Sequence, residues 1–462
     1  MSEFLLLLTP LLPLLLAAPW LRRFIPGAIY VAILPSLLLL LFAEKSVLEL
    51  SWLLLGSGLG FAEQTPLLLS MALLLWLPAA FFLSTQLQRS DGALSSEIIN
   101  QRYSTFFLLT LSGYLAAILA IDVIGFFTFS TLMGYSFYGL LINGGGDSAK
   151  RAGLVYLCFL IIADLLLFEA ALIAVVATDN LSFSAVRDAN LSIDVVRTAK
   201  LNFAAVHTAL PTSDYSSLYL SMVVLGFALK AGFWPVYFWL PLAFRAAAPP
   251  IALLIGGVPV AIALLGILRW LPLGEITLPL AGRVVQFSGL AAVLFSLLYV
   301  LIRRELKTLP AQLTLMATGL FTVALGIGLS QPDLWQQYGH LAYFYIVFLS
   351  LALALLTATI AWRHDGKQSA DKSMNPTEVR VMWVERGSAR IVRRIRSLGM
   401  ETLPRLRATS LATAQYYLHI PVWKKALKNA ELILQRWSFA ITLLVLLGIV
   451  FVLVVINKLL LN

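Results

Sequence analysis

Long apolar runs separated by short polar segments form the dominant pattern along the chain. A run of about 20 apolar residues is long enough to cross a bilayer as a helix. The pattern predicts about twelve such spans, at residues 3–20, 25–43, 65–86, 104–121, 123–142, 153–177, 217–241, 249–271, 284–303, 309–330, 338–362 and 438–457. The chain is 60% hydrophobic and 12% charged, whereas a soluble domain is about half apolar and about a quarter charged. We therefore predict an all-α polytopic membrane protein.

Basic residues lie in alternate loops, and this pattern predicts how the chain is oriented across the membrane. They are Arg22 and Arg23, Arg89 and Arg102, Lys150 and Arg151, Arg245, and Arg303, Arg304 and Lys307. The positive-inside rule places these loops in the cytoplasm. Both termini are therefore predicted on the periplasmic side of a bacterial inner membrane. No basic residue precedes the first apolar run, which favours a first membrane helix over a cleaved signal.

A polar, basic segment, residues 363–436, follows the predicted bundle at residues 1–362 and precedes an anchor at residues 437–462. Its apolar side chains Val384, Ile391, Ile395 and Leu398 share one helical face. Its basic side chains include Arg390, Arg393, Arg394, Arg396, Lys424 and Lys425. The pattern predicts an amphipathic arm on the cytoplasmic face, which begins loosely at about residues 364–376. The arm either rests on anionic lipid or also straps a neighbouring subunit.

Charge and cysteine usage narrow the classes of function. The net charge is +10. Because the basic residues concentrate in the arm, this charge indicates a membrane surface or an acidic partner subunit rather than nucleic acid. The single cysteine, Cys158, excludes an internal disulfide and a cysteine-built metal site, and the four histidines lack metal-ligand spacing. We expect no metal, no cofactor and no catalytic chemistry in this chain.

Ionisable residues inside the predicted spans are few, and such residues are costly enough to indicate function. The main ones are Lys230 in the seventh span and Asp164 and Glu169 in the sixth. Pro235 follows the lysine and predicts a broken helix, a kind of backbone that membranes tolerate where it lines a hydrated cavity. A lysine there can exchange protons, or it can form a static ion pair with Asp164. The residue types leave both interpretations open.

The block that begins at Lys230 resembles the signature of a known family. The match consists of Lys230, Pro235, Trp239, Leu240, Pro241, Ala243, Pro249, Ala252 and Leu253. It is similar to antiporter-like subunits of respiratory complex I, Mrp-type sodium/proton antiporters, membrane-bound hydrogenases and some inorganic-carbon uptake systems. The resemblance covers roughly residues 50–362. It implies helix breaks at Pro235, Pro241 and Pro249 and a proton-transfer site at Lys230. Asp164 and Glu169 are the candidate carboxylates, with Asp164 at a family position.

Several family positions carry different residues here. Thr131 stands where the family has a glutamate, Leu242 where it has an aspartate, and Ile255 where it has a histidine. Phe344 and Phe348 stand at a histidine and a lysine position. We therefore expect the region around Ile255 and Phe348 to be dry and tightly packed, and the subunit alone to conduct no protons.

Lys307 matches the lysine of the family's Asp-Ile-Lys-Arg segment. It is therefore a further candidate for proton transfer. Because it lies beside Arg303 and Arg304, it is predicted at the cytoplasmic edge, where it cannot replace a charge in the middle of the membrane. The family's later helices, with their exit-side lysine, are missing from the resemblance.

Three functions fit these observations. In the first, the chain is a proton-conducting subunit of a complex driven by a redox module of the NADH/quinone or hydrogenase type. Alternatively, it is the membrane partner of a zinc-containing cytosolic subunit in inorganic-carbon uptake, or a structural subunit that scaffolds active neighbours. All three imply partner membrane subunits, and a peripheral cytosolic subunit is also expected.

Overall fold

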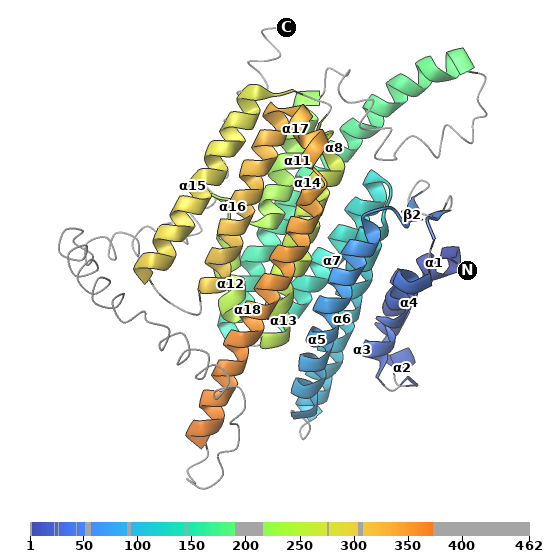
Figure 1. Cartoon of the computed structure of the whole chain (residues 1–462). Coiled ribbons are helices and arrows are strands. Elements are labelled where there is room, and N and C mark those ends of the chain that lie inside the picture. The colour runs from blue at the N-terminus through green and yellow to red at the C-terminus, as the bar shows by residue number, and fades with distance from the viewer. Residues whose placement is uncertain are drawn as a thin grey trace, which may run out of the picture. The chain divides into compact units, whose positions relative to one another are not determined.

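The computed structural model describes residues 2–372, apart from residues 23, 26, 43, 51–56, 90–93, 144–145, 190–215, 275–276 and 304–307 (Figure 1). Lys307, the predicted arm beyond Lys372 and the predicted anchor lie outside these residues. The chain divides into two compact units. Among the described residues, the second unit contains only residues 298–303 and 359–372, at the ends of two helices. Every candidate site residue discussed below belongs to the first unit.

The N-terminal half begins with short helices and a small hairpin and continues with four long helices. Its elements are α1 (Ser2–Leu16), α2 (Pro19–Arg22), α3 (Ala28–Val31), α4 (Leu34–Phe42), β1 (Val47–Glu49), β2 (Gly58–Gly60), α5 (Thr65–Arg89), α6 (Leu94–Leu119), α7 (Val123–Ile142) and α8 (Gly146–Ala189). The hairpin is antiparallel, and Val47 lies opposite Gly60. Long apolar helices α5, α6 and α7 lie side by side in Figure 1.

The second half contains a helix pair around a break, an irregular helix and three long helices. Its elements are α11 (Ser216–Ala231), α12 (Trp239–Ala246), α13 (Pro249–Ile255), the π-helix η2 (Gly256–Val260), α14 (Ala261–Trp270), α15 (Pro279–Arg303), α16 (Leu309–Ser330), α17 (Pro332–Tyr338) and α18 (Leu341–Lys372). Helices α13, η2 and α14 together form one span, Pro249–Trp270, of which 94% is buried, against 22% for Pro279–Ile302 in α15. The first of these spans is therefore central in its unit.

Eight helices of the described residues are long and apolar enough to cross a membrane, and three shorter apolar helices accompany them. These eleven helices coincide with the first eleven predicted spans. The twelfth, residues 438–457, lies outside the described residues, so the total of twelve stays a prediction. Several boundaries differ from expectation, and two helices extend well beyond their predicted ends. Helix α8 continues through Ala189, and α18 continues through Lys372, where a loose segment was predicted after residue 362.

The seventh predicted span is interrupted between Lys230 and Pro235, as predicted, and the break begins at Gly232. Helix α11 ends at Ala231, and Gly232 adopts a left-handed φ of 68°. The Phe233 amide donates to the Ala228 carbonyl at 2.9 Å. This six-residue closure with a left-handed glycine is the Schellman arrangement that ends many helices. Pro235 then lies in the break before α12 begins.

Side-chain packing holds the break in place. The Trp239 indole N–H, at the start of α12, donates to the Leu229 carbonyl at 3.2 Å and satisfies one of the last carbonyls of α11. A Cβ on Gly232 would come within 2.6 Å of the Leu240 side chain. Since the backbone there requires φ above zero and leaves no space, only glycine fits without rearrangement.

Two buried charges hold the connection between α6 and α7. The Asp122 carboxylate caps α7 by accepting from the Gly125 amide at 2.6 Å, and it also accepts from the Gly58 amide of β2 at 2.9 Å. The Arg269 guanidinium of α14 donates to carbonyls at the end of α6, those of Ala117 at 2.9 Å and Ala120 at 2.9 Å among them. Each charge thus satisfies the unpaired backbone groups of a helix end.

Replacing Arg269 by methionine should destabilise the fold. The change removes charge-assisted hydrogen bonds to buried carbonyls, and bonds of this kind contribute roughly 1.5–3 kcal/mol each. We expect the unfolding free energy to fall by about 2 kcal/mol or more, measured as a lower melting temperature in detergent. Arg283→Met, at an exposed position of α15, is the matched control. Equal melting of the two variants would contradict the capping role.

Gly232→Ala should lower the free energy of unfolding more than Gly146→Ala does. Gly146 also has a left-handed φ, 76°, but a Cβ there would meet no atom of the described residues within 4 Å. Both variants bear the left-handed strain of about 1–2 kcal/mol, and only Gly232→Ala adds a clash with Leu240. Thermal denaturation of the two variants measures the difference. Identical losses would show that the Leu240 contact does not fix the break.

Candidate functional site

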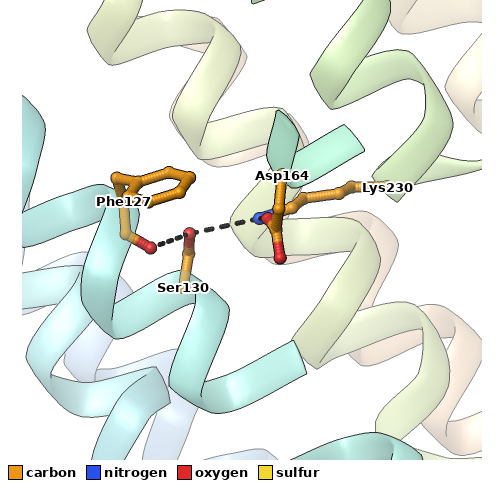
Figure 2. A network of polar contacts seen from close by, with 4 residues as sticks. All are labelled: Phe127, Ser130, Asp164 and Lys230. Carbon is orange, nitrogen blue, oxygen red and sulfur yellow. Dashed lines mark hydrogen bonds and ion pairs between the residues drawn. The ribbon is translucent and has the colours of Figure 1, made fainter. Parts of the chain in front are cut away.

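An ion pair between Lys230 and Asp164 lies where α11 ends. Lys230 is in the last turn of α11, and its Nζ is 2.6 Å from Asp164 Oδ1 of α8 (Figure 2). The two side chains are 6% and 9% exposed. The predicted proximity of the two residues is therefore confirmed.

Close helix packing places this pair. Gly226, one turn before Lys230, lies so near α8 that a Cβ on it would come within 3.2 Å of the Ala163 carbonyl. Ala163 directly precedes Asp164. Because glycine lets the two backbones approach, the lysine and the aspartate reach each other.

A third helix contributes to the same contact. Lys230 Nζ donates to Ser130 Oγ of α7 at 3.4 Å, and Ser130 Oγ donates to the Phe127 carbonyl at 2.9 Å. Figure 2 shows these groups in one chain from α7 to the lysine. Helices α7, α8 and α11 are thus joined by polar groups at a buried position.

Both carboxylate oxygens of Asp164 lack hydrogen-bond partners among the described residues, although Oδ1 forms the ion pair with Lys230. The hydroxyl oxygen of Thr131, the residue after Ser130, also lacks one. Asp164 Oδ1 is held by the ammonium group, so the carboxylate keeps one oxygen able to accept a proton or a water. A buried polar atom without a partner costs free energy, and such atoms are frequent where a site exchanges water or protons.

Two tyrosines also belong to the electrostatic surroundings of Asp164. The phenols of Tyr135 on α7 and Tyr156 on α8 lie within electrostatic range of Asp164. Tyr156 is buried, whereas Tyr135 is 39% exposed. Neither tyrosine was predicted as a site residue from the sequence. The sequence indicated them only through helical spacing. Tyr156 lies two turns before Asp164, and Tyr135 lies one turn after Thr131, so each shares a helical face with a candidate residue.

The structure separates the other predicted residues from this pair. Glu169 is exposed on α8 rather than turned toward Lys230. Of the three prolines, Pro235 lies in the break, Pro241 lies inside α12, and Pro249 begins α13. Lys307 and the basic residues of the predicted arm lie outside the described residues.

The region around Ile255 and Phe348 was expected to be tightly packed. This expectation is wrong for Phe348, whereas the burial of Ile255 agrees with it. Ile255 is fully buried, but Phe344 is 56% exposed and Phe348 is 71% exposed. The two phenylalanines share a face because residues four apart lie on the same side of a helix. Tyr345, whose hydroxyl donates to the Ala317 carbonyl of α16, shows that a different face of α18 packs inward.

The interior side of α16 carries polar but uncharged residues. Buried on it are Gln312, Thr314, Thr318 and Thr322. The threonine hydroxyls donate to carbonyls of their own helix, for example Thr322 to Thr318 at 2.7 Å. Among the described residues no group of histidine, cysteine, aspartate and glutamate could hold a metal ion. The charged chemistry of the interior is thus concentrated at Lys230 and Asp164, and at the helix caps Asp122 and Arg269.

Comparison with known proteins finds relatives that are components of an antiporter and of a hydrogenase. The chain is 28% identical over 238 residues to a probable K(+)/H(+) antiporter component of Rhizobium meliloti (strain 1021), and the match covers 49% of this chain and 40% of that protein. It is 27% identical over 235 residues to hydrogenase-4 component B of Escherichia coli (strain K12), with 49% and 32% covered. The matches thus span less than half the length of these relatives.

A solved structure shares the fold. A chain of the membrane-bound sulfane sulfur reductase, an archaeal respiratory membrane complex, superposes with a TM-score of 0.58 at 17% identity and covers 78% of this chain and 70% of that chain. The family described as NADH:quinone oxidoreductase/Mrp antiporter, TM, matches residues 120–456. Since this match covers well over half of the sequence, the chain is a multi-pass membrane protein that belongs to the NADH:quinone oxidoreductase/Mrp antiporter family.

Proposed function

We propose that this chain is a subunit of a multi-subunit ion-translocating complex in a bacterial inner membrane, and that Lys230 and Asp164 exchange protons there. The observation that carries the proposal is the buried pair itself, with Nζ and Oδ1 2.6 Å apart and Oδ2 without a partner among the described residues. Its relatives are named as parts of an antiporter and of a hydrogenase, which supports a role inside a larger assembly.

The chemistry of the pair follows from its surroundings. In a low-dielectric interior, burying two charges is costly, so an ion pair and a neutral pair differ less in free energy than in water. A proton can therefore pass from Nζ to Oδ1 over the 2.6 Å that separate the two atoms. Alternatively, starting from the ion pair, a proton that arrives from outside at Oδ2 would neutralise the carboxylate and release the ammonium from its partner.

A proton could reach Asp164 from the side of the bundle on which Tyr135 lies. The phenol of Tyr135 lies within electrostatic range of Asp164, and Tyr135 is 39% exposed, while Asp164 is buried. Protons move only between groups within hydrogen-bond reach, directly or through water. A route from Tyr135 to Asp164 would thus begin at the outer side of α7 and end at Lys230. The driving reaction would come from partner subunits.

A structural role is the second candidate, and one observation favours it. Thr131 stands at the family's glutamate position, and the lysine instead contacts a carboxylate on another helix, Asp164 of α8. An ion pair of this kind can hold α8 to α11 without moving protons. Removing both charges at once separates the two roles, because a buried pair can be replaced by apolar residues of similar volume without loss of stability.

Lys230→Met should abolish proton transport by the intact complex. The variant removes the group that loads and releases the proton, and we expect at least about a tenfold loss, since proton-transfer groups contribute roughly 10²–10⁴-fold. The measurement is quenching of a pH-sensitive dye by inverted membrane vesicles. Lys150→Met, at a lysine that is 72% exposed on α8, is the matched control.

Assembly must be measured beside transport, because leaving Asp164 unpaired can destabilise the fold by about 3–5 kcal/mol. The double variant Lys230→Met/Asp164→Leu removes this penalty. If the double variant assembles and transports protons like the native complex, the pair is structural and the proposed proton site is wrong. Normal assembly with lost transport is the result that the proposal requires.

The purified subunit alone should conduct no protons in liposomes. Crossing a hydrocarbon core of about 30 Å requires several groups within hydrogen-bond reach of one another. Among the described residues of α16 and of Leu341–Ile360 in α18, no side chain is charged. Dye quenching under an imposed potential is the measurement. Rapid flux that Lys230→Met abolishes would show that this chain contains the whole path.

A further inference from the structure

Helix α8 carries two carboxylates in its membrane-spanning part, and they face different surroundings. Asp164 is buried against Lys230, whereas Glu169 is exposed. Five residues separate them, which turns their side chains about 140° apart around the helix axis. The proposed proton site therefore leaves Glu169 without a role.

Glu169 lies too deep in the apolar run to reach water easily. Residues 152–177 contain no other formal charge than those of Asp164 and Glu169. Residues 170–177 are all apolar, so Thr178 is the next polar position, about 13 Å farther along the helix. A hydrocarbon core of about 30 Å corresponds to about 20 helical residues. Glu169, five residues from Asp164, thus lies within the hydrocarbon layer.

The surface around Glu169 is apolar and exposed in the isolated chain. Leu165 is 61% exposed, Phe168 is 46% exposed and Leu172 is 44% exposed. Leu165 and Leu172 are neighbours of Glu169 at helical spacings of four and three residues. Among the residues that the structure describes, no lysine or arginine forms an ion pair with Glu169. A carboxylate left against lipid chains in this way is costly.

We propose that this face of α8, formed by Leu165, Phe168, Glu169 and Leu172, docks onto another membrane subunit of the same complex. The partner would present a lysine or arginine at the depth of Glu169, surrounded by apolar side chains. Charge complementarity carries this assignment, because buried ionised groups in membranes are paired. A lipid headgroup does not fit, since it lies at the membrane surface. The inference rests on the proposed function only in that the chain belongs to a complex.

The first test measures assembly of the complex in membranes of its own host. The full chain is tagged, extracted in mild detergent, and its copurifying membrane subunits are quantified by mass spectrometry. We expect Glu169→Lys to lower the yield of one adjacent subunit at least tenfold, and Glu169→Gln to lower it less. Glu63→Lys, at an exposed glutamate before α5, should leave the yield unchanged. Native yields for Glu169→Lys would overturn the inference.

A second measurement guards against misfolding of the charge-reversed variant. Phe168→p-benzoylphenylalanine keeps the glutamate and allows photocrosslinking in intact membranes. The crosslink should fall within a membrane helix of a subunit that copurifies with the native chain, within about one turn of a lysine or arginine. Changing that basic residue to glutamate should restore the yield of Glu169→Lys. Crosslinks only to lipid, to a second copy of this chain, or to a helix without a basic residue would contradict the inference.

The outcome for this surface is independent of the outcome for the proton site. Native assembly of Glu169→Lys together with lost transport in the Lys230 and Asp164 double variant would refute the docking surface and leave the proposed function standing. Lost assembly of Glu169→Lys together with native transport in that double variant would do the reverse.

Discussion

Inside a bilayer every backbone hydrogen-bonding group needs a partner within the protein, and this requirement fixes the candidate site. Breaking a membrane helix frees the carbonyls of its last turn. Here the Phe233 amide and the Trp239 indole satisfy two of them, at Ala228 and Leu229. Because these bonds hold the end of α11 in one place, Lys230 in its last turn is also held, within 2.6 Å of Asp164. The position of the charge thus follows from how the broken helix ends.

The same requirement explains the other buried charges. At the junction of α6 and α7, Arg269 donates to carbonyls where α6 ends, and Asp122 accepts from the amide of Gly125 where α7 begins. A cation at a helix C-terminus and an anion at a helix N-terminus each complement the helix dipole. These two charges are therefore occupied by the backbone, unlike Lys230 and Asp164, whose partners are side chains. Only a side-chain pair can change its protonation without releasing a helix end.

Sequence periodicity and composition predicted the spans of the described residues and the pairing of Lys230 with Asp164, because both depend on apolar length and on opposite charges in adjacent helices. The break was predicted between Lys230 and Pro235, and α11 ends within that interval. The left-handed turn at Gly232 was not predicted, since the backbone conformation of a glycine is not visible in an apolar pattern. The role of Arg269 was not predicted, because its partners are backbone carbonyls, which every residue carries. Phe344 and Phe348 were placed by resemblance alone, and a resemblance does not fix which face of a helix packs inward.

Two carboxylates on one helix show how position decides role. Asp164 and Glu169 have the same chemistry, and both lie within the apolar part of α8. The helix turns Asp164 toward the close contact with α11, where Gly226 admits the lysine, and turns Glu169 outward among leucines. The first carboxylate is therefore satisfied within the chain, and the second requires a partner from outside it. Tyr135, on α7, is also partly exposed. Proton exchange at the inward pair and docking at the face around Glu169 therefore both depend on what covers α7 and α8 in the assembled complex.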